Sequence, residues 1–323
     1  MNSVEIIGFG SYAPENVITN DEISKIVDTS DEWISTRSGI RERRISTGEN
    51  TSDLSIKAAL AAMKNTGVSP EELDMIIVAT SSPDAYTPST ACLVQAGIGA
   101  VNAECFDISA ACTGFIYGLR IASQFIKTGE VKTALVIGAE VLSKILNWED
   151  RSTCVLFGDG AGAAIIRLGQ ENGIISTYTG ADGTGKDSLY CPAAPVNNPY
   201  ISDPKILNNT ISMNGKEVFK FAVKVMEKSI EEVLKKSECS IDNIKYIVPH
   251  QANIRIIEFA AKRLNLSLDK FYINLDRYGN TSAATIPTAL DEMLQRGVLN
   301  KGDKVVIVGF GAGLTWGSAL IQI

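Results

Sequence analysis

The stretch "ACTGFIYGLRIASQFIKTGEVKTALVIGAE" (residues 111–140) has a counterpart later in the chain, "GNTSAATIPTALDEMLQRGVLNKGDKVVIVGFG" (residues 279–311). Both contain a turn of small residues, a helix-length segment, a glycine beside charged residues, and a Val/Ile-rich run, in that order. Aligned in this way, Cys112 falls opposite Asn280. Self-similarity over this length predicts that the domain is duplicated.

The repeat extends upstream of both stretches. An apolar run ends in a polar loop before each of them, and Ser82 precedes Cys112 by the same interval as His250 precedes Asn280. We therefore predict two halves of similar structure. They are expected at residues 1–172 and 173–323.

Short apolar runs alternate with segments of helical periodicity, which is typical of an α/β fold. The carboxyl ends of strands are where functional groups collect in such folds. Two halves joined about a pseudo-symmetry axis are therefore expected to bring Cys112, His250 and Asn280 into one central cleft. The predicted strands are residues 75–82, 133–140, 245–251 and 303–311, and the predicted helices are 52–66, 114–129 and 216–236.

Composition narrows the possible functions. The net charge of −7 and pI near 5.0 disfavour nucleic acid or an anionic membrane as the main partner. The N-terminus shows neither a signal peptide nor a membrane span, so a cytoplasmic location is expected. Six cysteines without a C-x-x-C pair and a single histidine make a zinc site unfavourable, and we predict no metal.

Three residues carry the chemical argument. Cys112 is expected at or just before a helix N-terminus, where unpaired N–H groups lower the pKa of a thiol and make it nucleophilic. His250, the only histidine, follows a strand in a polar loop. Each residue also has a purely structural interpretation: Cys112 and His250 as core residues, and Asn280 as the cap of a helix beginning near Ser282.

Seven motifs together resemble β-ketoacyl-acyl carrier protein synthase III, a member of the thiolase superfamily. They are "DTSDEWISTRSGIRERR", "DISAACTGF", "FGDGAGAA", "NGKEVFKFAV", "VPHQANIRII", "GNTSAATIP" and "GFGAGLTWGSAL". The resemblance covers the chain from Ile6 to its C-terminus. It implies a duplicated thiolase-like fold with five αβαβα layers.

The resemblance also implies a reaction. Cys112 would accept an acyl group from acyl-CoA, while His250 and Asn280 would promote decarboxylation of malonyl-acyl carrier protein. The products would be a 3-oxoacyl-acyl carrier protein, CoA and CO2, at the start of fatty acid synthesis. No cofactor is implied, because acyl-CoA is a substrate, and a homodimer is expected.

Further site residues follow only from the resemblance. The backbone N–H groups of Cys112 and Ala312 would form an oxyanion hole. The family often has glycine at the Ala312 position, and we expect function to survive because only the N–H is used. Thr87 would line the acyl pocket, and its small side chain predicts acceptance of branched as well as acetyl starters.

Two surfaces are implied as well. CoA binding is expected at Thr29, Trp33, Arg37, Arg151, Gly215, Phe219, Ala252 and Asn253. An indole and a guanidinium suit stacking on adenine, and arginine suits phosphates. An acidic carrier protein is expected to dock at Lys220, Arg255, Lys262 and Arg263, although lysines spaced four apart from Lys216 to Lys228 also fit a solvated helix face.

Three other readings compete. The order Cys, His, Asn also occurs in papain-like hydrolases, but their local cysteine signature is absent. A polyketide- or quinolone-type condensing enzyme of secondary metabolism would carry the same three residues. A non-catalytic binding protein would not need all three.

Overall fold

The computed structural model describes residues 3–170, 173–203 and 209–323. The predicted boundary between the halves, at residue 172, lies outside these residues. Within the described ranges, none of the helices combines the length and apolar character needed to cross a membrane.

The strands are β1 Ser3–Tyr12, β2 Val17–Thr19, β3 Glu42–Arg44, β4 Met75–Ala79, β5 Glu104–Ile108, β6 Thr133–Glu140, β7 Gly160–Gly169, β8 Ile174–Ala181, β9 Leu189–Tyr190, β10 Ser212–Met213, β11 Tyr246–Pro249, β12 Lys304–Gly311 and β13 Thr315–Gln322. The α-helices are α1 Asn20–Ile23, α2 Asp31–Ser38, α3 Thr51–Thr66, α4 Thr90–Ile98, α5 Gly114–Thr128, α6 Gly215–Lys236, α7 Ile254–Arg263, α8 Leu275–Tyr278 and α9 Thr285–Gln295.

Two sheets organise the chain. The first has the order β1-β7-β6-β4-β5, in which β4 pairs in parallel with β5 and β6, while β7 runs antiparallel to β6 and β1. The second has the order β11-β12-β13-β8, with β11 and β12 parallel and the other pairs antiparallel. The second sheet therefore repeats the strand order of the first without a counterpart of β5.

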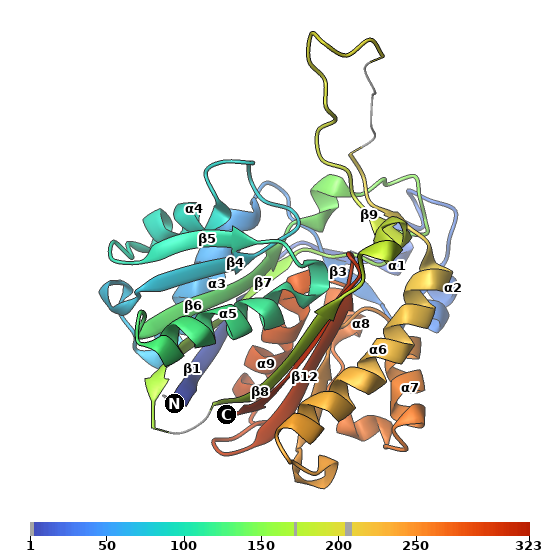
Figure 1. Ribbon diagram of the computed structural model, residues 1–323. Coiled ribbons are helices and arrows are strands. Elements are labelled where there is room, and N and C mark those ends of the chain that lie inside the picture. Colours follow the sequence, from blue (N-terminus) through green and yellow to red (C-terminus); the bar gives the residue numbers. More distant parts are fainter. Residues whose placement is uncertain (1–2, 171–172, 204–208) are drawn as a thin grey trace.

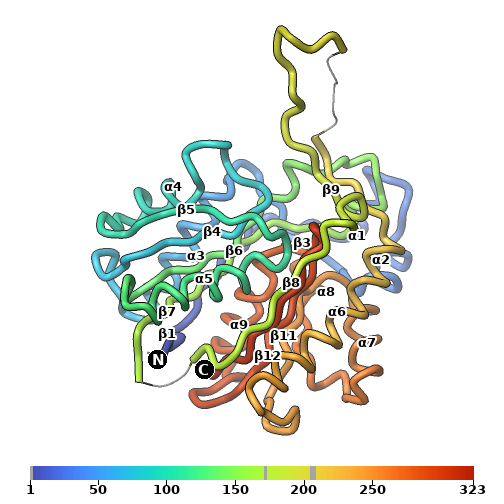
Figure 2. The backbone as a smooth tube through the Cα atoms, in the orientation of Figure 1, coloured from blue at the N-terminus to red at the C-terminus, as the bar shows by residue number. Residues whose placement is uncertain are grey.

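Helices and sheets alternate in five layers. Helices α5 and α9 lie between the two sheets, α3 and α4 cover the outer face of the first sheet, and α6 and α7 cover the outer face of the second (Figure 1). Each interface holds its own apolar core, and the central one joins Phe115 and Leu119 of α5 to Ile286 and Leu290 of α9. The predicted αβαβα layering is thus observed. The continuous tube in Figure 2 shows α5 and α9 enclosed between the sheets.

Local sequence signals explain where the outer helices begin and end. Asn50 caps α3 with its side chain, and Gly67 ends the helix with φ of 73°. Ser89 and Gly99 (φ 75°) do the same for α4. Glycine adopts this left-handed conformation without the steric penalty that a side chain carries, so each helix ends at a glycine.

The repeat has a constant spacing, and it corrects the alignment made from sequence. Pairs of matching elements, such as β1 with β8 and β6 with β12, begin 171 residues apart. Two matching 3-10 turns also keep this spacing, η2 (Ala111–Thr113) and η7 (Ser282–Ala284), and each begins with a residue at positive φ, 47° and 49°. The structural counterpart of Cys112 is therefore Ala283, and pairing it with Asn280 was wrong by three positions. The sequence alignment paired polar residues with each other, whereas the structure repeats a turn of the backbone.

Candidate active site

The candidate nucleophile is held at the junction of two elements. Cys112 is the middle residue of η2, directly before α5, and its side chain is 6% exposed. The end of β12 presses against it, since a Cβ placed on Gly311 would lie 2.8 Å from the Cys112 backbone nitrogen. No side chain caps the start of α5. The predicted position before a helix N-terminus is therefore observed.

The predicted lowering of the thiol pKa is wrong. Burial raises the pKa of Cys112 to about 12, because a thiolate in this apolar setting loses its hydration. An interaction with Ser282 opposes this effect, and the charge of Glu140 adds to it. The Cys112 backbone N–H also lowers the pKa, but together with Ser282 it does not offset the desolvation.

Glu140 is a buried carboxyl beside the thiol that sequence reasoning missed. Its oxygens accept hydrogen bonds from Ser82 Oγ at 2.5 Å, from the Ser81 N–H at 3.0 Å and from Thr80 Oγ1 at 3.2 Å. Burial raises the pKa of Glu140 despite these donors. Glu140 is the last residue of β6, so its position at a strand end was the signal available in the sequence.

The second half contributes His250 and Asn280. His250 follows β11 directly, is 1% exposed, and stacks edge-on against Phe310 with ring centroids 5.4 Å apart. Burial lowers the pKa of its imidazole to about 3, so the ring is neutral at physiological pH. Backbone hydrogen bonds from Asn280 N to Leu156 O (2.9 Å) and from Gly158 N to Asn280 O fix the asparagine loop.

Cys112, His250 and Asn280 line one cavity of about 120 Å³. The central cleft expected for these three residues is therefore present. Four residues expected to bind CoA line the same cavity: Gly215, Phe219, Ala252 and Asn253. An outer cavity of about 510 Å³ is lined by Phe219 and Asn253 together with Arg37, Arg255 and Lys262. The two shared residues connect the buried site with a basic surface.

The remaining residues expected at the CoA site lie together at the surface. The guanidinium groups of Arg37 and Arg151 lie 4.6 and 5.1 Å from the centre of the Trp33 ring. Arg151 also donates a hydrogen bond to the backbone oxygen of Asp28 at 2.8 Å. Thr29 Oγ1 is buried and has no hydrogen-bond partner within the described ranges.

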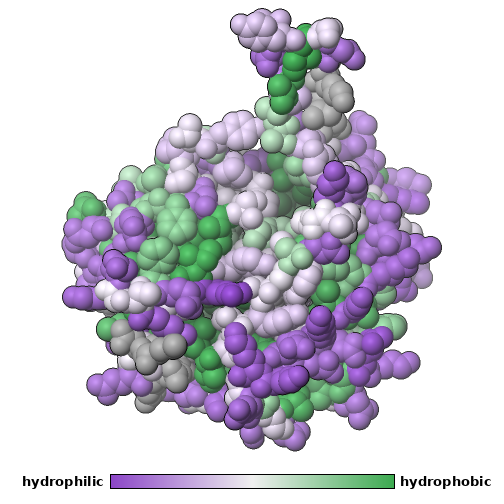
Figure 3. Space-filling model, in the orientation of Figure 1, coloured by the Kyte–Doolittle hydropathy of each residue, from purple (hydrophilic) through white to green (hydrophobic). Residues whose placement is uncertain are grey.

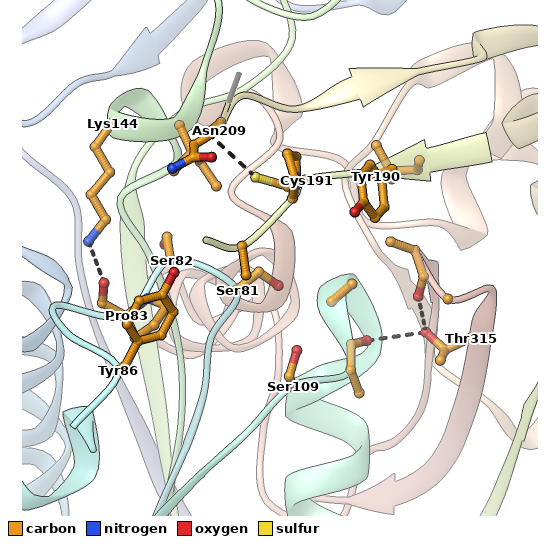
Figure 4. Close-up of a pocket in the computed structure, with 18 of the residues that line it drawn as sticks. Ser81, Ser82, Pro83, Tyr86, Ser109, Lys144, Tyr190, Cys191, Asn209 and Thr315 are labelled. Carbon is orange, nitrogen blue, oxygen red and sulfur yellow. Dashed lines mark hydrogen bonds between the residues drawn. The ribbon is translucent and has the colours of Figure 1, made fainter. Parts of the chain in front are cut away.

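Two further cavities lie beside Cys112 and its neighbour Ala111. A small one of about 70 Å³ is lined by Cys112, Ser282 and Ala312. A wide one of about 990 Å³ is lined by Ala312 and Thr87, and Figure 4 shows other parts of its lining, including Tyr86. Thr87 therefore lines the wide cavity, which shares Ala312 with the small one. It lines neither of the two cavities that Cys112 lines.

The four cations expected to bind the carrier protein differ in their contacts: two are in ion pairs and two line a cavity. Lys220 pairs with Glu217 at 2.9 Å, and Arg263 pairs with Glu227 at 2.5 Å. Arg255 and Lys262 line the outer cavity. Over the residues with described placement, no cluster of three or more His, Cys, Asp or Glu side chains could hold a metal ion.

Comparison with known proteins now decides the family. A beta-ketoacyl-[acyl-carrier-protein] synthase III of Clostridium acetobutylicum is 67% identical over 322 residues, covering 100% of this chain and 99% of the relative. The chain belongs to the β-ketoacyl-acyl carrier protein synthase III family. The family models for 3-oxoacyl-[acyl-carrier-protein] synthase III and its C-terminal part match residues 106–183 and 234–323. Synthase III enzymes are acyltransferases that condense an acyl-CoA with malonyl-acyl carrier protein to start fatty acid synthesis, and this is the reaction of the chain.

Solved structures confirm the thiolase-like fold of this synthase III. The enzyme of Aquifex aeolicus is 47% identical, with a TM-score of 0.92 over 99% of this chain and 100% of that chain. A priming β-ketosynthase from the R1128 polyketide pathway is 34% identical, with a TM-score of 0.93 over 100% and 96% of the two chains. Membership of the family excludes the papain-like hydrolase.

Proposed function

We propose that the condensation proceeds through an acyl thioester on Cys112, with His250 and Asn280 assisting decarboxylation. The observation that carries this proposal is the shared cavity of the three side chains and its connection to the surface past Phe219 and Asn253. A thiol, an imidazole and a carboxamide drawn from both halves of the chain meet there in a buried setting.

In the first half-reaction, the Cys112 sulfur attacks the thioester carbon of acyl-CoA. A new S–C bond forms, the bond to the CoA sulfur breaks, and the thiol proton is delivered to the departing CoA thiolate. Covalent acylation divides the condensation into two easier steps. The N–H groups of Cys112 and Ala312 are suited to hold the oxygen of the tetrahedral intermediate, since both residues line the small cavity.

In the second half-reaction, malonyl-acyl carrier protein loses CO2 and negative charge develops on its thioester oxygen. Asn280 supplies a neutral N–H donor, and the neutral imidazole of His250 supplies another when its proton is on Nε2. The enolate carbon then attacks the acyl carbon, and the bond to Cys112 Sγ breaks. Each donor of this kind contributes roughly 3 to 4 kcal/mol to transition-state stabilisation.

Two assays test the proposal. After incubation with acyl-CoA, mass spectrometry should place one acyl group on the Cys112 peptide, and Cys112→Ala should remove it. Malonyl-acyl carrier protein should release CO2 with the wild type, and His250→Ala and Asn280→Ala should slow this release without preventing acylation. Acylation at another cysteine would refute the assigned nucleophile.

We also propose the CoA site. Trp33, Arg37 and Arg151 already form a cation–aromatic stack at the surface, which suits an adenine ring and phosphates. Thr29 follows Asp28, whose backbone oxygen accepts a hydrogen bond from Arg151, and would lie at the edge of the nucleotide site. Gly215, Phe219, Ala252 and Asn253 would line the path of the pantetheine arm to Cys112.

The starter group is proposed to include branched acyl chains. Thr87 lines the wide cavity beside the small cavity of Cys112, so its small side chain leaves room there. Replacing Thr87 with Phe should reduce kcat/KM for isobutyryl-CoA more than for acetyl-CoA, because one methylene of pocket space is worth about 1 to 3 kcal/mol. Competition between the two thioesters measures the ratio. A wild-type enzyme with a steep preference for acetyl-CoA would contradict the proposal.

The carrier protein is proposed to dock on α6 and α7. Figure 3 shows hydrophilic residues gathered over these helices. Arg255→Glu with Lys262→Glu should raise KM for malonyl-acyl carrier protein by a larger factor than KM for acyl-CoA, because an acidic partner would meet repulsion at the outer cavity. Lys64→Glu with Lys132→Glu is a control of equal charge at exposed positions outside α6 and α7. An unchanged KM for the first pair would remove these residues from the docking surface.

Assembly and location are also proposals. We propose a homodimer, supported by the segment of residues 191–203, which follows β9 and projects from the body in Figure 1. On it, Val196 and Tyr200 are 74% and 95% exposed, which is unfavourable for apolar side chains unless a partner covers them. A cytoplasmic role in fatty acid synthesis fits the high identity with the clostridial enzymes, whereas a role in secondary metabolism rests on the shared fold with the polyketide priming enzyme.

A further inference from the structure

One turn of the chain contacts both proposed donors of the decarboxylation site. This turn is η7, Ser282–Ala284, followed by Thr285 at the start of α9. The Ser282 N–H donates to Asn280 Oδ1 at 2.9 Å. Because Oδ1 is thereby occupied, the amide presents its Nδ2 hydrogens as donors.

Thr285 makes the corresponding contact with the histidine. Its Oγ1 lies 2.8 Å from His250 Nδ1, and both side chains are buried, at 3% and 1% exposure. The same Oγ1 is also placed to donate to the Ser282 carbonyl oxygen at 3.0 Å, although that oxygen already accepts the Thr285 backbone N–H. The hydroxyl has one proton, so it can donate either to Nδ1 or to that carbonyl.

This choice determines what His250 can do. A neutral imidazole carries one N–H. If Thr285 donates to Nδ1, the ring proton is on Nε2 and His250 is a hydrogen-bond donor to the cavity. If Thr285 donates to the Ser282 carbonyl, Nδ1–H must donate to Thr285, and Nε2 is left as an acceptor that cannot stabilise an enolate.

We propose that Thr285 is a positioning residue that donates to Nδ1 and holds His250 in the Nε2–H tautomer. The turn η7 would then orient both donors, Asn280 through its backbone and His250 through the hydroxyl that follows it. The inference rests on the proposed function of His250 and Asn280. Phe310, stacked edge-on against the imidazole, restricts the ring from turning away.

The single histidine makes a direct test possible. Protein labelled with 15N-histidine gives one pair of ring signals, which report the protonation of Nδ1 and Nε2 separately. The wild type should show a protonated Nε2 and an unprotonated Nδ1. A protonated Nδ1 in the wild type would overturn the proposal and needs no variant to be observed.

Variants extend the test to catalysis. Thr285→Val keeps the shape of the side chain but has no hydroxyl, and it should reduce the Nε2–H population and slow malonyl decarboxylation roughly tenfold or more. Acylation of Cys112 should stay within about twofold of the wild type. Thr285→Ser should restore both the tautomer and the decarboxylation rate, whereas Thr288→Val, one turn along α9, is a matched control.

The outcomes separate this inference from the proposed function. Wild-type enzyme that fails to decarboxylate malonyl-acyl carrier protein would refute the proposed roles of His250 and Asn280 whatever its tautomer. Wild-type decarboxylation with an unchanged tautomer and rate in Thr285→Val would refute the role of Thr285 alone. If Thr285→Val does not fold, the wild-type spectrum and Thr285→Ser still test which ring nitrogen of His250 carries the proton.

Discussion

At the scale of single residues, Cys112 is subject to two opposing effects. The start of α5 attracts negative charge, but the pocket around the sulfur removes water, and burial raises the pKa of the thiol to about 12. The thiol is therefore protonated at neutral pH. Its proton has to leave as the bond to the acyl group forms, which makes proton delivery part of the loading step.

Alkylation measures this pKa directly. The rate of Cys112 modification by iodoacetamide should rise about tenfold per pH unit from pH 6 to 9 without a plateau, because the thiolate fraction grows until pH reaches the raised pKa. The extent of modification is followed by mass spectrometry of the Cys112 peptide. A plateau near pH 7 would show that the helix start outweighs burial.

The sequence predicted that Cys112, His250 and Asn280 meet in one cleft, and they line one cavity, but it did not reveal the side chains that contact them. Cys112, His250 and Asn280 could be recognised because their chemistry is rare and they stand at turns. Thr285, Ser282 and Glu140 could not, since common residues acquire such contacts only when strand and helix ends meet in three dimensions. The same limitation explains the wrong pKa direction, which depends on how completely the folded chain excludes water from the sulfur.

At the scale of elements, the end of β12 determines the shape of the site. Gly311 is the last residue of β12, and a Cβ there would lie 2.8 Å from the Cys112 backbone nitrogen and 3.1 Å from its Cβ. The neighbouring Ala312 lines the small cavity with its side chain in place. A side chain is therefore tolerated at one of these positions and excluded at the other.

Two substitutions test this difference. Gly311→Ala should lower kcat roughly 100-fold, because it displaces the Cys112 backbone, and with it the N–H proposed to bind the oxyanion, by a few tenths of an ångström or more. Ala312→Gly, which installs the residue often found in the family, should stay within about twofold of the wild type. Steady-state kinetics with acyl-CoA and malonyl-acyl carrier protein measure both. Equal effects of the two changes would refute this account.

At the scale of the whole molecule, the two halves pack closely together at a glycine. Gly138 in the middle of β6 faces the backbone of η7, and a Cβ there would lie 2.2 Å from the Ala283 carbonyl oxygen. The backbone of the second half thus rests directly on the sheet of the first. This close contact places η7, and with it Ser282 and Thr285, next to the turn that contains Cys112.

Overpacking at this contact should be costly. Gly138→Ala is expected to reduce the free energy of unfolding by about 3 kcal/mol, because neither backbone can move without disturbing its own sheet or turn. Gly183→Ala is the matched control, since a Cβ at Gly183 meets nothing within 4 Å, and it should change the free energy by less than about 0.5 kcal/mol. Urea unfolding followed by circular dichroism compares the two.

Most of the architecture could be anticipated from the chain. The runs at 133–140 and 303–311 predicted strands that the structure shows as β6 and β12, and the periodicity from 114 predicted α5. The register of the repeat could not be predicted, because Ala111 and Ser282 share a backbone conformation and no chemical property. Antiparallel partners such as β1 and β7 were also not predicted, since their pairing joins segments far apart in sequence.

The constant spacing of the halves has an evolutionary meaning. Two identical subunits would hold the same residue at both turns, so a substitution in one would be imposed on the other. Fusion into a single polypeptide removes that restriction. Cys112 stands where the other half has Ala283, and Asn280 stands where the first half has Ser109. Because one polypeptide contains both turns, the proposed nucleophile can occupy one half while the proposed hydrogen-bond donors occupy the other.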